Sequence, residues 1–185
     1  MEQLSDILAR ATRAIPEEYF RLAIHGGPPV YRERVYCYEL YHQKRSLWPD
    51  DCPFCLNGEI DKQAHPILQQ LGAAYAKPDF LIHTPGDMAG NHAIMEVKPL
   101  GAARGDIHAD LEKLCLFVSR VRYQRAIYLL YGYGEEGRTL DRVCDVYARL
   151  DDPRGIEIWL HAEAGQPARC VVELPQRTQT GPNAA

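Results

Sequence analysis

The chain has 185 residues, 25% of them charged, and a formal net charge of −4 at neutral pH. This length suits one domain with a well-developed core, and the composition is ordinary for a globular protein. The negative charge argues against nucleic-acid binding by bulk attraction alone, although a local basic face stays compatible with it. We expect a single domain over residues 1–175, followed by a disordered tail over residues 176–185.

The start of the chain and its cysteines predict a cytoplasmic protein. The first residues carry no basic region of a signal peptide, and no apolar run is long enough to cross a bilayer. The six cysteines are therefore expected to be reduced thiols. Cys52 and Cys55 have the spacing of half a zinc site, but no second Cys or His pair follows at a comparable spacing. Structural or incidental cysteines are the favoured interpretation, with a zinc-bound interaction module as a weaker alternative.

Residue patterns along the chain predict both helices and strands. Apolar residues at helical spacing indicate helices, and alternating or buried apolar runs indicate strands. In chain order, the predicted elements are helices over Gln3–Ile15, Glu17–Ile24 and Val30–Leu47; a weaker strand candidate over Leu56–Lys62; a connection or short helix over Pro66–Tyr75; strands over Lys77–His83 and Ala93–Lys98; a helix over Asp106–Arg122; a strand over Ala126–Tyr131; a helix over Thr139–Leu150; and strands over Ile156–His161 and Arg169–Leu174. This order favours an α/β fold with a central mixed β-sheet, helices on both faces and a C-terminal β-hairpin.

One carboxylate falls on the side of the helix Val30–Leu47 that is predicted to face the core. Helical spacing places Val35, Tyr38, Glu39 and His42 together on that side. A carboxylate is unusual in a stripe that should pack on a core, so Glu39 is a candidate functional residue. An ion pair with an arginine at the edge of the helix is about as good an explanation.

Two strands joined by a turn place charged side chains on one face of the predicted sheet. Glu96 and Lys98 are two residues apart and therefore share a face. If the strands pair symmetrically about the turn at residues 84–91, Asp79 lies opposite Glu96, and Leu81 lies opposite Ile94. Two facing carboxylates repel each other unless a positive group lies between them. A divalent cation together with Lys98 would supply that charge.

The motif in these two strands resembles that of the PD-(D/E)xK nuclease superfamily. It reads Pro78-Asp79, then sixteen residues, then Glu96-Val97-Lys98. Both halves fall on predicted strands, a helix with an internal Glu precedes them, and a helix and a strand follow. The resemblance covers about residues 30–131 and implies a restriction-endonuclease-like core. The string alone is short, and its position among the predicted elements gives it weight.

The resemblance implies a metal-dependent phosphodiesterase site. Asp79, Glu96 and the backbone carbonyl of Val97 would hold Mg²⁺ or Mn²⁺, because such hard cations prefer oxygen ligands. Lys98 would position or deprotonate the attacking water and offset charge in the transition state. Glu39 resembles the additional acidic residue of the family and could hold a second metal or a water. Glu59 and Asp61, in the weaker strand candidate, rank below Glu39.

The leading functional hypothesis is a nuclease that acts on nucleic acid, most simply DNA. Cutting of both strands would suit a homodimer. The first alternative is a catalytically inactive protein of the same fold that binds nucleic acid or another protein. A purely structural interpretation is also open, in which Glu96 and Lys98 form an ordinary ion pair on a solvated sheet face.

Overall fold

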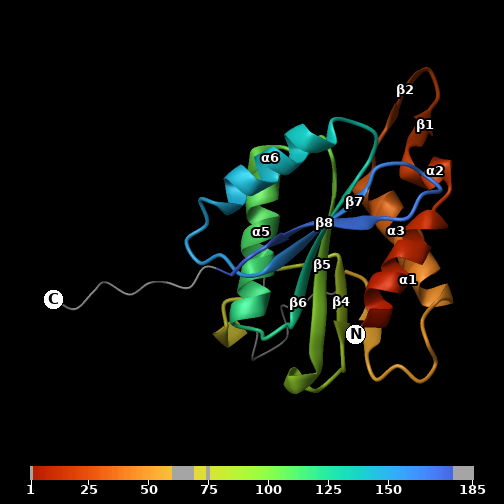
Figure 1. The fold of residues 1–185 in the computed structure, drawn as a ribbon. Coiled ribbons are helices and arrows are strands. Elements are labelled where there is room, and N and C mark those ends of the chain that lie inside the picture. The colour runs from red at the N-terminus through yellow and green to blue at the C-terminus, as the bar shows by residue number, and fades with distance from the viewer. Residues whose placement is uncertain (1, 60–68, 74–75, 177–185) are drawn as a thin grey trace.

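The computed structural model describes residues 2–59, 69–73 and 76–176. Its centre is a six-stranded sheet in the order β3-β4-β5-β6-β7-β8 (Figure 1). The strands are β3 (Cys55–Asn57), β4 (Phe80–His83), β5 (Asn91–Pro99), β6 (Arg125–Tyr131), β7 (Ile156–His161) and β8 (Arg169–Leu174). The pairs β5–β6 and β6–β7 are parallel, and the other three pairs are antiparallel, so the sheet is mixed as predicted.

Helices cover both faces of this sheet. The helices are α1 (Glu2–Arg13), α2 (Glu17–Phe20), α3 (Glu33–Ser46), α5 (Arg104–Ser119) and α6 (Glu136–Tyr147). Figure 1 shows α5 and α6 on one side of the sheet and α1 and α3 on the other. The order α3-β3-β4-β5-α5-β6 confirms the predicted order of helix, three strands, helix and strand. No helix in the described ranges is both long enough and apolar enough to cross a membrane.

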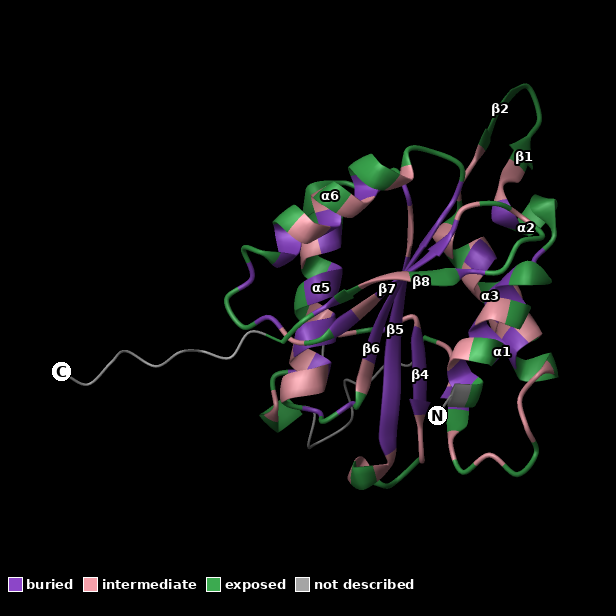
Figure 2. Ribbon diagram, in the orientation of Figure 1, coloured by how far each residue is buried: buried purple, intermediate pink, exposed green. Residues whose placement is uncertain are grey.

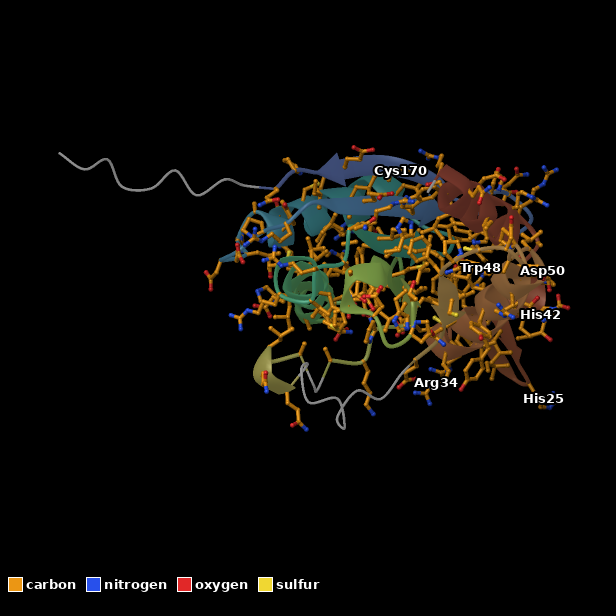
Figure 3. All side chains as sticks on the ribbon, turned by 90° about the horizontal axis from the view of Figure 1, so that it is seen from below. His25, Arg34, His42, Trp48, Asp50 and Cys170 are labelled. Carbon is orange, nitrogen blue, oxygen red and sulfur yellow. The ribbon has the colours of Figure 1, made fainter. Side chains whose placement is uncertain are left out.

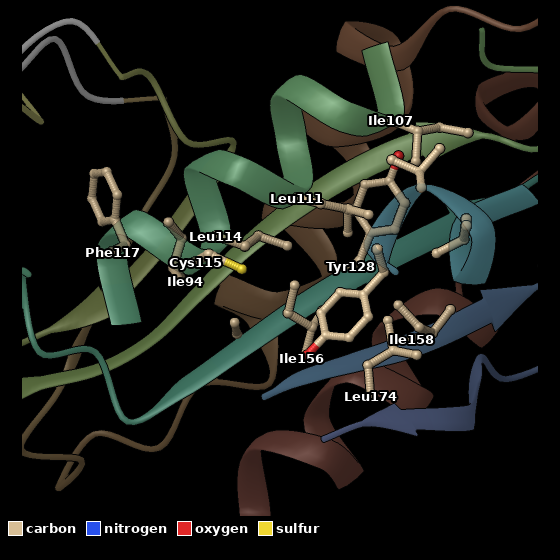
Figure 4. Packing of buried hydrophobic residues seen from close by; sticks show 14 of the residues in the cluster. Ile94, Ile107, Leu111, Leu114, Cys115, Phe117, Tyr128, Ile156, Ile158 and Leu174 are labelled. Carbon is tan, nitrogen blue, oxygen red and sulfur yellow. The ribbon is translucent and has the colours of Figure 1, made fainter. Parts of the chain in front are cut away.

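The two faces of the sheet carry separate hydrophobic cores. Along β5, Ile94 joins the core under α5 and α6, whereas Met95 and Val97 join the core under α1 and α3. The neighbouring strand β6 divides its side chains in the same way, so that these two central strands are buried along most of their length (Figure 2). Figure 4 shows the first core, in which side chains of α5 lie over side chains of the strands. Those of α5 are Ile107, Leu111, Leu114 and Cys115, and those of the strands are Ile94, Tyr128, Ile156 and Ile158.

The predicted register of the hairpin β4–β5 is confirmed. Leu81 pairs with Ile94, and Phe80 pairs with Met95, so the next position outward places Asp79 beside Glu96. A 3₁₀ turn, Met88–Gly90, closes the connection, where the Thr84 N–H donates to the Gly90 carbonyl at 2.9 Å. A Cβ atom on Gly90 would lie 2.5 Å from the Cβ atom of Thr84, so only glycine fits this close approach.

The structure differs from the prediction after Phe20. A helix was predicted over Glu17–Ile24, but α2 ends at Phe20 and is followed by a hairpin of β1 (Leu22–Ile24) and β2 (Gly27–Val30). Ile24 pairs with Gly27, which leaves a two-residue turn in which Gly26 has a φ of +76°. Turns of this kind need positive φ, which glycine supplies without strain. His25 and Gly26 therefore form the turn of a hairpin, and the predicted helix ends four residues early.

The face of α3 that packs on the sheet also differs from the prediction. Tyr36, Leu40 and Lys44 are the fully buried residues of this helix, each 0% exposed. Tyr38 of the predicted stripe is 67% exposed, and His42 lies on the outer surface (Figure 3). The predicted face of the helix was wrong. The face that packs on the sheet includes a lysine, Lys44, which the helix buries in the core.

The remaining elements follow the predictions closely. The strands Ile156–His161 and Arg169–Leu174 and the helix α5 are confirmed, the helix with ends shifted by two or three residues. In the described part of the strand candidate Leu56–Lys62, β3 ends at Asn57, which places Glu59 beyond its end. Residues 60–62 of this candidate, Asp61 among them, half of the connection Pro66–Tyr75, and residues 177–185 of the tail lie outside the described residues.

Candidate active site

Three of the predicted site residues, Asp79, Glu96 and Lys98, line a cleft of about 420 Å³ between α3 and α5, over the start of β4 and the end of β5. Three further acidic residues line it: Glu33 from α3, Asp110 from α5, and Glu59, the lower-ranked candidate, just after β3. The antiparallel register of β4 and β5 brings the first three together, and the helices supply Glu33 and Asp110.

Asp79 lies just before β4 and is fixed by the neighbouring strand. Its Oδ2 accepts a hydrogen bond of 2.7 Å from the Val97 N–H. Val97 therefore contacts Asp79 through its amide. Burial raises the pKa of Asp79 to about 6, the hydrogen bond from Val97 opposes this, and the charge of Glu33 adds to it. A carboxylate at this position is costly without a cation beside it.

Glu96 is the most deeply buried acid of the site, at 1% exposed. Its Oε2 accepts a hydrogen bond of 2.8 Å from Lys113 Nζ, while its Oε1 is buried and has no hydrogen-bond partner among the residues that the structure describes. Burial raises the pKa of Glu96 well above its usual value, and the nearby charge of Asp79 raises it further. This burial contradicts the purely structural interpretation, which required a solvated sheet face.

Lys98 is held as a cation between two acidic residues. Its Nζ lies 2.9 Å from Glu33 Oε2 and 3.3 Å from Asp110 Oδ2. Burial by itself would lower the pKa of Lys98, but the hydrogen bond to Glu33 and the charge of Asp110 raise it well above its usual value. An ammonium group with a raised pKa cannot take up a proton at neutral pH. Lys98 can therefore stabilise negative charge, but it is not a general base in this arrangement.

Three residues that form ion pairs with Lys98 or Glu96 were not predicted from the sequence: Glu33, Asp110 and Lys113. Asp110 and Lys113 flank the apolar stripe of α5 in sequence, where each precedes a residue of the core. Their position at the edge of a stripe predicted to face the sheet was a usable signal. Glu33 is the first residue of α3, where an acidic residue is readily explained by the helix dipole.

Glu39 is not among the residues that line the cleft. Its Oε1 accepts a hydrogen bond of 2.6 Å from Gln43 Nε2 within the same helix. At about 100° per residue, Glu39 lies about 240° around the helix from Glu33, whereas Cys37 and Tyr41 stay on the cleft side. The structure therefore brings Glu33, and not Glu39, from α3 to the site.

The acidic surplus of the cleft fits a divalent cation. Five acidic side chains line the cleft, those of Glu33, Glu59, Asp79, Glu96 and Asp110, against four basic ones, those of Arg34, Lys77, Lys98 and Lys113. Magnesium commonly binds through one or two carboxylates and keeps several waters. Asp79 and Glu96 meet that requirement, and the unpartnered Oε1 of Glu96 is an available ligand atom. Within the described ranges, no group of three or more His, Cys, Asp or Glu side chains is arranged to hold a metal ion.

An Asp79→Asn variant should be more stable than the wild type by about 1–3 kcal/mol above about pH 7 without divalent ions. The raised pKa means that the folded state binds the proton of Asp79 more tightly than the unfolded chain does. Stability therefore falls as the pH rises from about 4 to about 6 and stays low above that. Asparagine does not ionise and still accepts the bond from Val97.

Denaturant unfolding in the presence of a chelator, compared between about pH 4 and about pH 8, measures this difference. We expect the two proteins to be similar at the acidic end and to diverge toward neutral pH. Equal stability at about pH 8 would mean that Asp79 carries no electrostatic cost.

The cysteine pair gives no support to the zinc interpretation. Cys52 is half-buried and Cys55 is exposed. Cys55 pairs with His83 across β3 and β4, but the Nε2 of His83 lies 2.9 Å from Asn57 Oδ1. Of the residues that the structure describes, no metal-binding group includes them.

Comparisons with known proteins give one distant structural likeness. No protein-family model and no curated protein matches the chain. One solved structure, SfsA of Pyrococcus furiosus in complex with Ca²⁺, is similar at 12% identity and a TM-score of 0.36 over 83% of this chain and 69% of that one. At this level the likeness carries no argument about function. The α/β fold with its six-stranded mixed sheet rests on the structure itself.

Proposed function

We propose that the protein is a nuclease that hydrolyses phosphodiester bonds in nucleic acid, most simply DNA, with Mg²⁺ or Mn²⁺. One observation carries this proposal: Asp79, Glu96 and Lys98, from the two arms of one hairpin, meet in one cleft with acidic residues of α3 and α5. The cleft lies where the resemblance to the PD-(D/E)xK superfamily places a phosphodiesterase site. The buried charges there are costly to the fold, which is typical of a site kept for its chemistry.

The side chains of the cleft would take three roles. Asp79 and Glu96, with the carbonyl of Val97, would hold the metal ion, which when bound supplies Lewis-acid stabilisation of a phosphate oxygen and a bound water as nucleophile. Lys98 would offset the charge that develops on the phosphate in the transition state. Glu33 and Asp110 are positioning residues, because they hold the ammonium group of Lys98 in the cleft.

The rim of the cleft suits a nucleic acid. Tyr38 and Tyr41 line its α3 wall, and Tyr38 is 67% exposed. Arg34 lies on the same wall with a side chain that is 70% exposed, in an ion pair of 3.3 Å with Glu59 (Figure 3). Aromatic rings beside cationic groups bind bases and phosphates without a strongly basic chain. This local arrangement is compatible with the net charge of −4.

A catalytically inactive binding protein of the same fold is the second candidate. It is favoured by the ion pairs of Lys98, because both carboxylates around its ammonium group already compensate its charge. A substrate phosphate would have to compete with Glu33 and Asp110 for this group. The two candidates share the cleft and differ in whether bonds are cut.

Cleavage assays separate the two candidates. Plasmid, single-stranded DNA and RNA would be incubated with purified protein and Mg²⁺ or Mn²⁺, and product formation measured for the wild type, Glu96→Gln and Glu39→Gln. We expect wild-type cleavage, a loss of about 10²-fold or more in Glu96→Gln, and no change in Glu39→Gln, which alters an acid of α3 outside the cleft.

Two results would count against the catalytic proposal. Cleavage retained in Glu96→Gln would mean that the site is assigned wrongly. Binding of nucleic acid without cleavage of any substrate, in either metal, would favour the inactive binding protein.

A further inference from the structure

We propose that Lys113 is an internal counter-cation, whose ammonium group a divalent ion must displace from Glu96 in order to bind. This inference rests on the proposed function, because it takes Glu96 as a metal ligand. Lys113 belongs to α5 and not to the sequence motif. It would regulate the same site by setting the metal concentration at which the site fills.

The first observation is the set of oxygen atoms around Lys113. Its Nζ lies 2.8 Å from Glu96 Oε2, 3.4 Å from Asp110 Oδ1 and 3.5 Å from the carbonyl oxygen of Lys77. Carboxylate and carbonyl oxygens are the atoms that Mg²⁺ and Ca²⁺ prefer as ligands. The ammonium group therefore occupies an oxygen-lined position of the kind that a hard cation would take.

The second observation is that Lys113 satisfies only one of the two carboxylate oxygens of Glu96. Its Nζ donates a hydrogen bond to Oε2, whereas Oε1 is buried and has no hydrogen-bond partner within the described part of the chain. A single lysine thus leaves half of a carboxylate that is 1% exposed without compensation. A divalent ion carries twice the charge and can be approached by both oxygens.

The third observation is that Asp110 would still have an ion-pair partner if the ammonium group of Lys113 moved away. Asp110 faces both lysines, with Oδ1 toward Lys113 and Oδ2 3.3 Å from Lys98. If Lys113 moves away, Asp110 keeps the ion pair with Lys98. The side chain of Lys113 is 20% exposed, and a long flexible stem of this kind can carry its charged end to solvent.

These contacts also explain why the described part of the chain has no ready group of three metal-binding side chains. Glu96 and Asp110 both face Lys113, so their oxygens surround an ammonium group and not a metal position. Removing that positive charge should strengthen the attraction of the cleft for any divalent ion.

Calorimetric titration with Ca²⁺ alone, without nucleic acid, tests the proposal independently of catalysis. The proteins compared are the wild type, Lys113→Met and Arg138→Met. Arg138 has a side chain that is 76% exposed on α6, so its variant has the same change in net charge away from the cleft. We expect Lys113→Met to bind Ca²⁺ about tenfold or more tightly than the wild type, and Arg138→Met to match the wild type. Equal or weaker binding by Lys113→Met would overturn the proposal.

A measurement on the wild type covers the case in which Lys113→Met fails to fold. Acetylation of amines, quantified by mass spectrometry for each lysine, would be compared with and without Ca²⁺. Displacement predicts a several-fold rise in modification of Lys113, while Lys98, held by two carboxylates, serves as the internal reference. Unchanged or reduced modification of Lys113 would contradict displacement.

The outcomes also separate this inference from the proposed function. If the wild type binds Ca²⁺, Glu96→Gln abolishes that binding, and Lys113 neither competes nor becomes more reactive, then only the inference about Lys113 fails. If neither the wild type nor Lys113→Met binds any divalent ion, then the metal-dependent function fails together with it.

Discussion

Replacing Lys44 with Met should raise the free energy of unfolding by about 2–4 kcal/mol at neutral pH and below. Lys44 is 0% exposed on the core face of α3. Its Nζ contacts Met95 Sδ at 4.0 Å and lies 4.4 Å from the ring centre of Phe80. Burial lowers its pKa from 10.5 to about 7, and the charge of Cys37 opposes the shift only in part. The ring of Phe80 offsets some of the cost of this charge, by about 1 kcal/mol.

The pH dependence of this difference follows from the direction of the shift. Because the folded state holds the proton of Lys44 less tightly than the unfolded chain, its contribution to stability is lowest below about pH 7 and improves between about pH 7 and pH 10. The advantage of Lys44→Met should therefore be full at about pH 6 and shrink toward pH 10. Urea unfolding at several pH values measures it.

The neighbouring residue provides the control for this prediction. Arg45 is exposed, so Arg45→Met removes one positive charge from the same helix and should change stability by less than about 0.5 kcal/mol. If Lys44→Met were destabilising at all pH values, the ammonium group would be favourably placed in the core. The inference that its burial lowers the free energy of unfolding would then be wrong.

The sequence was sufficient for the strands that carry the motif. The turn residues between Thr84 and Asn91 predict a hairpin whose register holds from Phe80 to Ile82 and shifts by one residue only next to the turn, and alternation then decides which side chains share a face. For this reason the sequence alone places Asp79, Glu96 and Lys98 on one face. The C-terminal strand pair was equally readable, because two mostly apolar segments flank the turn residues Gly165, Gln166 and Pro167.

The residues that the helices contribute to the site could not be predicted from the sequence, and α3 illustrates the reason. Helical periodicity gives several apolar stripes that compete when a helix is rich in Tyr and Arg, and a lysine normally marks the solvent side. Here the buried stripe includes Lys44, which turns Glu39 away from the cleft and Glu33 toward it. The orientation of the helix is set by contacts with the sheet, and sequence spacing alone does not contain that information.

Replacing Lys98 with Met should lower the rate of cleavage at saturating substrate by about 10²–10³-fold, while binding of an oligonucleotide changes little. The expected loss is large because the ammonium group is fixed by Glu33 and Asp110 and would act on charge that develops only in the transition state. The fold should persist, since Asp110 keeps its contact of 3.4 Å with Lys113. Single-turnover cleavage, oligonucleotide binding and thermal unfolding measure the three quantities.

A Lys98→Arg variant distinguishes the two roles that the superfamily resemblance leaves open for this lysine. If Lys98 acts only through its charge, arginine should recover part of the lost rate, and wild-type cleavage should show no step from deprotonation of Lys98 up to about pH 10, because the pKa of Lys98 is raised. If Lys98 removed a proton from water, arginine would be as inactive as methionine, and the rate would rise with pH. Full activity in Lys98→Met would contradict both roles and leave the cleft as a binding site.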